Sequence, residues 1–205
     1  TLDSILSNRE KVIIEINKVS GGAYEISFTD ENKSSVTQLE SGITFILPAS
    51  GEFSSVQFED SFRAENWGGQ YDEKNSAIVF MTPFAGKYTV IDKTVDISDI
   101  SNLSAEHQKA IMFMVSKGFF SLDGDKFNPD GTLTRYAFSE AVIRMFFATD
   151  HSLKTAFSDI TEDNPYYPYV AAGEKTGTFK GYDDGMFHGE YDVLRQEVIA
   201  ICKRT

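Results

Sequence analysis

Hydrophobic residues follow two different periods in the two halves of the chain, and the change falls near residue 96. Before that point, short apolar runs alternate with polar positions in a period of two, and Gly, Ser, Asn and Asp clusters separate them. Runs of this kind that are rich in β-branched and aromatic residues predict strands. They span residues 11–19, 23–30, 42–49, 54–60, 77–84 and 86–92. Six or seven short strands predict an all-β, Ig-like sandwich over residues 1–95, with the role of a spacer domain.

After residue 96 the apolar residues recur every three or four positions, which predicts helices. Ser104 is placed to cap a helix over residues 106–117, and Gly118 is placed to end it. Thr134 is placed to cap a second helix. The apolar face of that helix is predicted to consist of Phe138, Ala141, Val142, Met145 and Phe146.

The same order of elements then recurs. Asn164 as a cap and Pro165 at the first helical position predict a short helix that ends near Gly177. Asp192 is placed to cap the final helix, whose apolar face contains Val198, Ile201 and Cys202. An offset of sixty residues relates 97–100 to 157–160, Asp123 to Asp183, Phe127 to Phe187, and Arg135 to Arg195.

Neither repeat has enough apolar surface to form a core alone, so we expect the two to pack together. The predicted fold is α+β and multi-domain. It consists of the sandwich followed in sequence by an all-α bundle of two helix-loop-helix repeats, over residues 96–150 and 151–205.

The formal net charge is −12, and the acid excess extends over the whole chain. Phosphate backbones need a basic surface, so a nucleic-acid partner is not expected. No apolar run approaches the roughly 18 residues that a membrane span requires. The single Cys202 rules out an internal disulfide and a cysteine-rich metal site. The sequence lacks H-E-x-x-H, G-x-S-x-G and P-loop patterns, so neither an enzyme nor a bound cofactor is expected.

The loop LDGDKFNPDGTLTR, residues 122–135, has the spaced acids of a calcium loop. Counted from Asp123, positions 1, 3, 5 and 12 of an EF-hand are Asp123, Asp125, Phe127 and Thr134. Two carboxylates are too few ligands for calcium. The sequence therefore predicts no metal site in this loop.

The order of these motifs resembles the S-layer homology repeat. Segment FSDITEDNPYYPYVAAGEKTGTFKGYDDGMF is the closest match, and FNPDGTLTRYAFSEAVIRMF is nearly as close. Segment NSAIVFMTPFAGKYTVID is similar to the last hairpin of small β domains that often precede such repeats in bacterial surface proteins.

The resemblance implies non-covalent attachment to the bacterial cell wall, and so an extracellular location. In this family, three repeats usually surround a pseudo-threefold axis. The grooves between them bind an acidic, often pyruvylated, secondary cell-wall polysaccharide through the arginine of a T-R-A-E motif. Carried over, this points to Arg135 and Arg195 as glycan-binding residues. A third repeat would come from the parent chain or from another protomer, or the anchor has been reduced to two.

The T-R-A-E motif is incomplete in both repeats, because Ala137 replaces its glutamate in the first and Leu194 replaces its threonine in the second. Further glycan-binding candidates by resemblance are Asp99, Asp159, His107, Tyr166, Tyr167, Gly181, Tyr182 and Glu197. Each has an alternative role: the arginines pair with loop acids such as Asp123 or Asp183, the aspartates cap backbone, the aromatics seal a small core, and the glycine shapes a turn. The alternative function is a structural or assembly module of a surface layer, with degenerate repeats that make protein contacts and bind no glycan.

Overall fold

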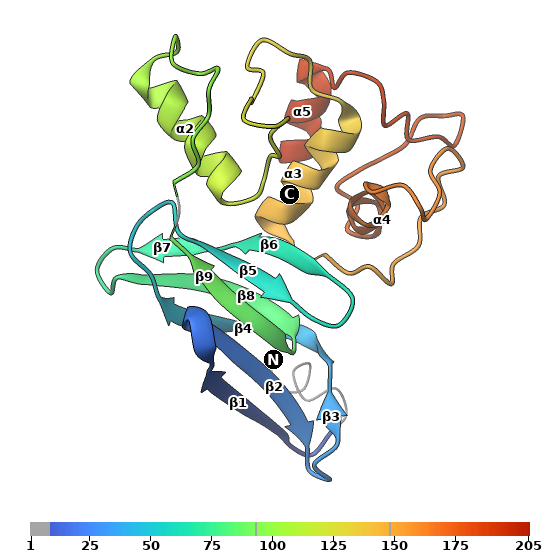
Figure 1. Ribbon diagram of the computed structural model, residues 1–205. Coiled ribbons are helices and arrows are strands. Elements are labelled where there is room, and N and C mark those ends of the chain that lie inside the picture. The colour runs from blue at the N-terminus through green and yellow to red at the C-terminus, as the bar shows by residue number, and fades with distance from the viewer. Residues whose placement is uncertain (1–8, 93, 148) are drawn as a thin grey trace. The chain divides into compact units, whose positions relative to one another are not determined.

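The computed structural model describes residues 9–92, 94–147 and 149–205, which form two compact units (Figure 1). One unit combines Thr1–Asp96 with Ser104–Gly118. The other combines Ile97–Leu103 with Phe119–Thr205.

The first unit is built on two antiparallel sheets, and all six predicted strand segments are strands. One sheet has the order β1-β2-β9-β5-β6, with β3 paired to β2, and the other has the order β4-β8-β7. The predicted β-structure of this half is therefore confirmed. The strands are β1 (Val12–Lys18), β2 (Ala23–Asp30), β3 (Ser35–Val36), β4 (Gln38–Pro48), β5 (Ser55–Glu59), β6 (Ala64–Gly68), β7 (Gln70–Asp72), β8 (Ala77–Phe84) and β9 (Gly86–Ile91).

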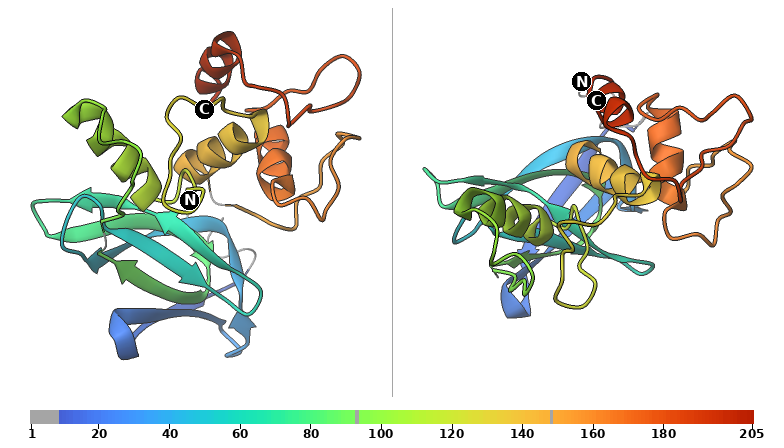
Figure 2. Two further views of the ribbon diagram at one scale, coloured as in Figure 1. Left: turned by 45° about the horizontal axis from the view of Figure 1, so that its top comes forward. Right: turned by 90° about the horizontal axis from the view of Figure 1, so that it is seen from above.

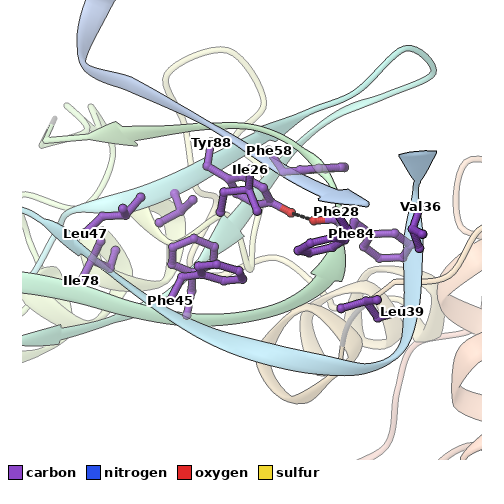
Figure 3. Packing of buried hydrophobic residues seen from close by; sticks show 12 residues of the cluster. Ile26, Phe28, Val36, Leu39, Phe45, Leu47, Phe58, Ile78, Phe84 and Tyr88 are labelled. Atoms are coloured by element: carbon purple, nitrogen blue, oxygen red, sulfur yellow. Dashed lines mark hydrogen bonds between the residues drawn. The ribbon is translucent and has the colours of Figure 1, made fainter. Parts of the chain in front are cut away.

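Alternating residues of both sheets point into a shared core (Figure 3). Phe58 and Tyr88 from one sheet meet Phe80 and Phe84 from the other, with ring centroids 5.2 Å apart for Phe80 and Tyr88 and 6.0 Å apart for Phe58 and Phe84. The buried Tyr88 hydroxyl donates to the Phe84 carbonyl at 2.8 Å, so its polar end is satisfied.

Residues 66–71 connect the two sheets. The chain leaves β6 and enters β7 through Gly68 and Gly69, whose φ values of 71° and 102° suit glycine. Trp67 packs on Phe58 at a centroid distance of 5.3 Å and on Phe84 at 5.8 Å. This aromatic segment therefore closes one side of the sandwich core.

Helix α2 (Ala105–Ser116) belongs to the same unit as the sandwich. The predicted cap is confirmed, because the Ser104 hydroxyl accepts from the His107 backbone N–H at 3.3 Å. Asn66 Nδ2 donates to the Ser116 carbonyl at 3.1 Å, and the buried Lys117 ammonium donates to the Ser54 carbonyl. These contacts tie the end of α2 to strands and loops of the sandwich.

The second unit contains α3 (Arg135–Phe146), α4 (Tyr167–Lys175) and α5 (Arg195–Cys202), joined by long irregular loops. Helices α3 and α4 pack against each other, as Figures 1 and 2 both show. Loop aromatics complete the core, among them Phe179 and Phe187.

The prediction of an all-α bundle for this half is wrong. Among the residues that the structure describes, those in strands outnumber those in helices, the helices are short, and α2 groups with the sandwich. The physical reason is that helices of two or three turns bury too little surface on each other. The loops must therefore contribute buried residues of their own.

Two predicted helix starts are also wrong, whereas the Thr134 cap is confirmed by its bond from the Ala137 N–H at 3.2 Å. Helix α4 begins at Tyr167, two residues after Pro165. The Asn164 side-chain oxygen accepts from the Tyr166 N–H at 2.9 Å, which forms a tight turn before the helix. Helix α5 begins at Arg195 rather than after Asp192.

Candidate functional site: the junction between the repeats

Two equivalent aspartates shape the loops of the two repeats. The carboxylate of Asp99 accepts from the backbone N–H of Phe127 at 2.9 Å and of Asn128 at 2.8 Å. Sixty residues on, Asp159 accepts from the N–H groups of Phe187 and His188, both at 2.7 Å. The hydrogen bond from Phe127 is the main reason why the pKa of Asp99 lies below its usual value. Asp99 and Asp159 therefore cap loop backbone, one of the two roles expected for them.

The start of α3, in the first repeat, pairs with the loop of the second repeat. The N–H of Arg135 donates to the Tyr191 carbonyl and that of Tyr136 to the Gly189 carbonyl, both at 2.9 Å. In return, the N–H of Val193 donates to the Leu133 carbonyl at 2.8 Å. These three bonds place the Arg135 side chain at the junction of the two repeats.

The Arg135 guanidinium lies in a socket that the second repeat supplies; we call Glu197, Tyr182 and the carbonyls of Phe187 and Lys180 the arginine socket. Nη1 donates to Glu197 Oε1 at 2.7 Å, Nε to the Phe187 carbonyl at 2.9 Å, and Nη2 to the Lys180 carbonyl at 3.4 Å. The carbon Cζ lies 4.8 Å from the ring centroid of Tyr182 and 4.7 Å from that of Phe187. Arg135 is only 5% exposed.

Glu197 is the electrostatic centre of the socket. Burial raises the pKa of this carboxyl, but bonds from the Leu194 N–H and the Tyr182 hydroxyl, with the charge of Arg135, outweigh burial and lower the pKa overall. Tyr182 donates to Glu197 Oε1 at 2.7 Å. Burial, and then this bond to Glu197, raise the pKa of Tyr182, which remains a neutral donor. The acid partner of Arg135 is thus Glu197, and not Asp123 or Asp183.

Arg195 stands at the same repeat position as Arg135 but in a different environment. It is the first residue of α5 and is exposed. Within the part of the chain that the structure describes, its side chain makes no hydrogen bond or ion pair. One of the two candidate arginines is therefore already paired within the protein, and the other is open to solvent.

Of the remaining candidates, two tyrosines lie in the core, Gly181 lies against an aromatic ring, and His107 lies in the other unit. The ring of Tyr166 stacks on that of Tyr136 at 5.1 Å and 3°, and Tyr167 is 9% exposed, so both fill the core. A side chain at Gly181 would lie 2.3 Å from the Phe157 ring, which explains the glycine. His107 lies on α2, in the unit that contains the sandwich.

The sequence reasoning missed two aromatic residues beside the socket, His188 and Tyr191. Their rings stack at 4.6 Å and 8°, and Tyr182 meets His188 edge-on at 5.1 Å. Asp184 Oδ2 lies 2.6 Å from His188 Nε2. The signal that could have identified this pair is a difference between the repeats, because Asn128 and Gly131 occupy these positions in the first one.

No cluster of three or more His, Cys, Asp or Glu side chains suited to a metal ion occurs among the described residues. The loop around Asp123 instead closes on itself, because Asp123 and Lys126 exchange backbone hydrogen bonds at 2.9 and 3.0 Å. A search of the described helices for one long and apolar enough to cross a membrane found none.

The family model of the S-layer homology domain matches residues 96–138 and 156–199, which confirms the resemblance of both repeats. The amylopullulanase of Thermoanaerobacterium thermosulfurigenes is 24% identical to the chain over 140 residues. That alignment covers 67% of this chain but only 7% of the amylopullulanase. No solved structure matches the chain.

Proposed function

We propose that this protein is held to the bacterial cell wall by its two S-layer homology repeats. Such repeats are non-catalytic modules that anchor proteins to bacterial cell surfaces. The ligand in this proposal is an acidic, pyruvylated secondary cell-wall polysaccharide. It binds without a covalent bond, at the junction where the first repeat meets the loop of the second.

The observation that carries this proposal is the unpaired Arg195. The protein is strongly acidic, so an anionic polymer needs a well-placed cation to approach it. A guanidinium at the first residue of a helix offers two parallel donors and adjoins the positive end of the helix dipole. Arg195 has this position, is exposed, and makes no side-chain hydrogen bond or ion pair within the described part of the chain. It would bind the carboxylate of the pyruvyl group.

Arg135 has a different part in this proposal. Its Nη1 and Nε atoms are held by Glu197 and by the Phe187 carbonyl, whereas Nη2 makes a single long contact of 3.4 Å. Nη2 is therefore the atom through which Arg135 would meet a glycan oxygen at the junction of the repeats. Its larger contribution is to hold the two repeats in register.

Binding to isolated wall sacculi of the producing bacterium tests the proposal. We expect the wild-type protein to pellet with sacculi that retain the polysaccharide. It should bind much less to sacculi from which mild acid has removed the pyruvyl groups. Arg195→Ala should weaken binding about tenfold or more, as expected for a lost charge-assisted bidentate contact.

Lys203→Ala is the matched control, because it removes one exposed positive charge next to the other end of the same helix. It should bind like the wild type. Failure of the wild type to pellet with intact sacculi would refute anchoring by these residues. Equal binding of wild type and Arg195→Ala would refute the role of Arg195 alone.

A second candidate function is a surface-layer assembly module, and one observation favours it. Ala137 stands where the second repeat has Glu197, so the first repeat lacks the carboxylate of an arginine socket. Sedimentation velocity distinguishes the two functions. Concentration-dependent oligomers without glycan, together with no binding to sacculi, would support assembly.

A further inference from the structure

An aromatic surface occurs in the loop of the second repeat and not in the loop of the first. We define the aromatic platform as Tyr182, His188 and Tyr191. Tyr182 is 41% exposed and Tyr191 is 58% exposed. The His188 ring stacks in parallel on one face of Tyr191. The His188 side chain between them is 19% exposed. Two exposed tyrosine rings beside a stacked imidazole are unusual for side chains that only stabilise a loop.

The first repeat shows that the loop folds without these rings. Asn128 and His188 have nearly the same left-handed φ, 56° and 53°, and the backbone N–H of each donates to the aspartate carboxylate of its own repeat. Gly131 donates to the Asn128 carbonyl at 2.9 Å, as Tyr191 donates to the His188 carbonyl at 3.0 Å. The backbone is thus equivalent at positions where the side chains differ. The aromatic side chains are therefore extra to the requirements of the turn.

The contacts of the platform hold its rings in place. Tyr182 is fixed by its hydroxyl bond to Glu197 and by the guanidinium of Arg135 over its face. His188 is fixed from its ring nitrogen by Asp184 at 2.6 Å and from its backbone by Asp159 at 2.7 Å. The edge-on contact of Tyr182 with His188 links the two. Rings that are already ordered lose little entropy when a ligand stacks on them.

Charge around the platform selects the ligand class. The exposed acids of the same loop are Asp183, Asp184, Glu190 and Asp192. They disfavour an anionic group here, so the pyruvyl carboxylate belongs elsewhere, at Arg195. Flat aromatic faces with hydroxyl and imidazole groups at their edges suit the apolar face and the equatorial hydroxyls of a pyranose ring.

We propose that Tyr182, His188 and Tyr191 form a stacking subsite for uncharged pyranose residues of the wall polysaccharide. This inference rests on the proposed anchoring function and extends it. Arg195 takes the acidic group of the polymer, and the platform takes neutral sugars of the same chain. The two subsites contribute separately to affinity.

The test uses the polysaccharide released from sacculi, in its native form and after mild acid has removed the pyruvyl groups, with calorimetric titration of the full chain. The variant His188→Asn with Tyr191→Gly copies the residues of the first repeat, so its backbone is one that this chain already adopts. Tyr191→Ser alone serves as a second variant if the double variant melts at a much lower temperature.

We expect the wild type to bind the depyruvylated polymer more weakly than the native one but measurably. Both platform variants should lose about tenfold or more in affinity for the depyruvylated polymer, whereas Arg195→Ala should bind it like the wild type. Equal binding by wild type and folded platform variants would overturn the platform and leave anchoring intact. So would binding of the native polymer without any binding of the depyruvylated one. Absence of binding to either polymer would overturn both proposals.

Discussion

The ion pair of Arg135 and Glu197 joins the two repeats, and removing either side chain tests whether it holds them together. The perturbations are Arg135→Met, which keeps most of the apolar stem, Glu197→Gln, which keeps the shape, and the double variant. The two side chains are 5% and 19% exposed, so water cannot replace their interaction well.

The structure sets the expected size of the effect. Breaking one side of a buried pair costs about 3–5 kcal/mol, because the other charge is left without its partner. Arg135 would keep two carbonyl contacts and two aromatic faces in Glu197→Gln, which reduces the loss to about 2–3 kcal/mol. The double variant should be more stable than the sum of the single losses predicts, by a coupling energy of about 1–3 kcal/mol.

Native-state hydrogen exchange measures this locally. The amides of Arg135, Tyr136 and Val193 bond across the junction and should lose protection in each variant. Amides of β8 in the sandwich provide an internal control that should not change. The surface pair Lys154 and Glu162, with side chains 63% and 68% exposed, is the matched control pair, and its removal should cost less than about 1 kcal/mol. A loss in Arg135→Met no larger than in Lys154→Ala, or a coupling energy near zero, would refute the reasoning.

Three further predictions follow from the same contacts. The pKa of Glu197 is lowered in the folded state, so its contribution to the free energy of unfolding is fully present above the ordinary pKa of 4.5 and is lost as pH falls through the lower folded value. The free energy of unfolding should therefore fall less on acidification in Glu197→Gln than in the wild type. Burial lowers the pKa of Lys117 to about 8 from an ordinary 10.5, so the unfolded chain binds more protons than the folded one between these values. In denaturant titrations, the free energy of unfolding of the sandwich unit should therefore rise by about 2–3 kcal/mol from pH 7 to 10.5. Lys117→Met should not show this rise. Asp159→Ala should destabilise the second unit by about 1–3 kcal/mol, and more than Asp99→Ala. Asp159 accepts from the N–H of Phe187, which is 1% exposed, whereas Asp99 accepts from the N–H of Phe127, which is only partly buried. Thermal unfolding of both variants checks this.

Features set by neighbouring residues could be predicted from the sequence. The alternating runs predicted the strands, and the hydroxyls of Ser104 and Thr134 predicted two helix caps, all of which the structure has. The sixty-residue offset predicted that equivalent residues have equivalent roles, and Asp99 and Asp159 do cap equivalent loops. Each of these inferences depends on contacts within one repeat or within one element.

Features set by contacts between distant residues could not be predicted. The partner of Arg135 lies sixty-two residues away, and several loop acids are closer in sequence. The predicted cap at Asp192 is wrong because the Glu197 carboxylate accepts from the Leu194 N–H at 2.8 Å, so that α5 begins only at Arg195. Predicted helix faces also failed to give a bundle, since buried loop aromatics such as Phe187 supply packing that helical periodicity does not reveal.

The difference between Ala137 and Glu197 explains why two arginines at one repeat position have different environments. Arg135 is paired because the second repeat carries a carboxylate, and the same carboxylate orders Tyr182. An anion at Arg135 would have to displace Glu197 from a buried pair, at a cost of several kcal/mol. An anion at Arg195 displaces no side chain that the structure describes. The junction of the two repeats is therefore rigid and internally neutralised, and Arg195 remains an exposed cation. Binding of an anion at Arg195, as proposed, would leave the contact between the repeats intact.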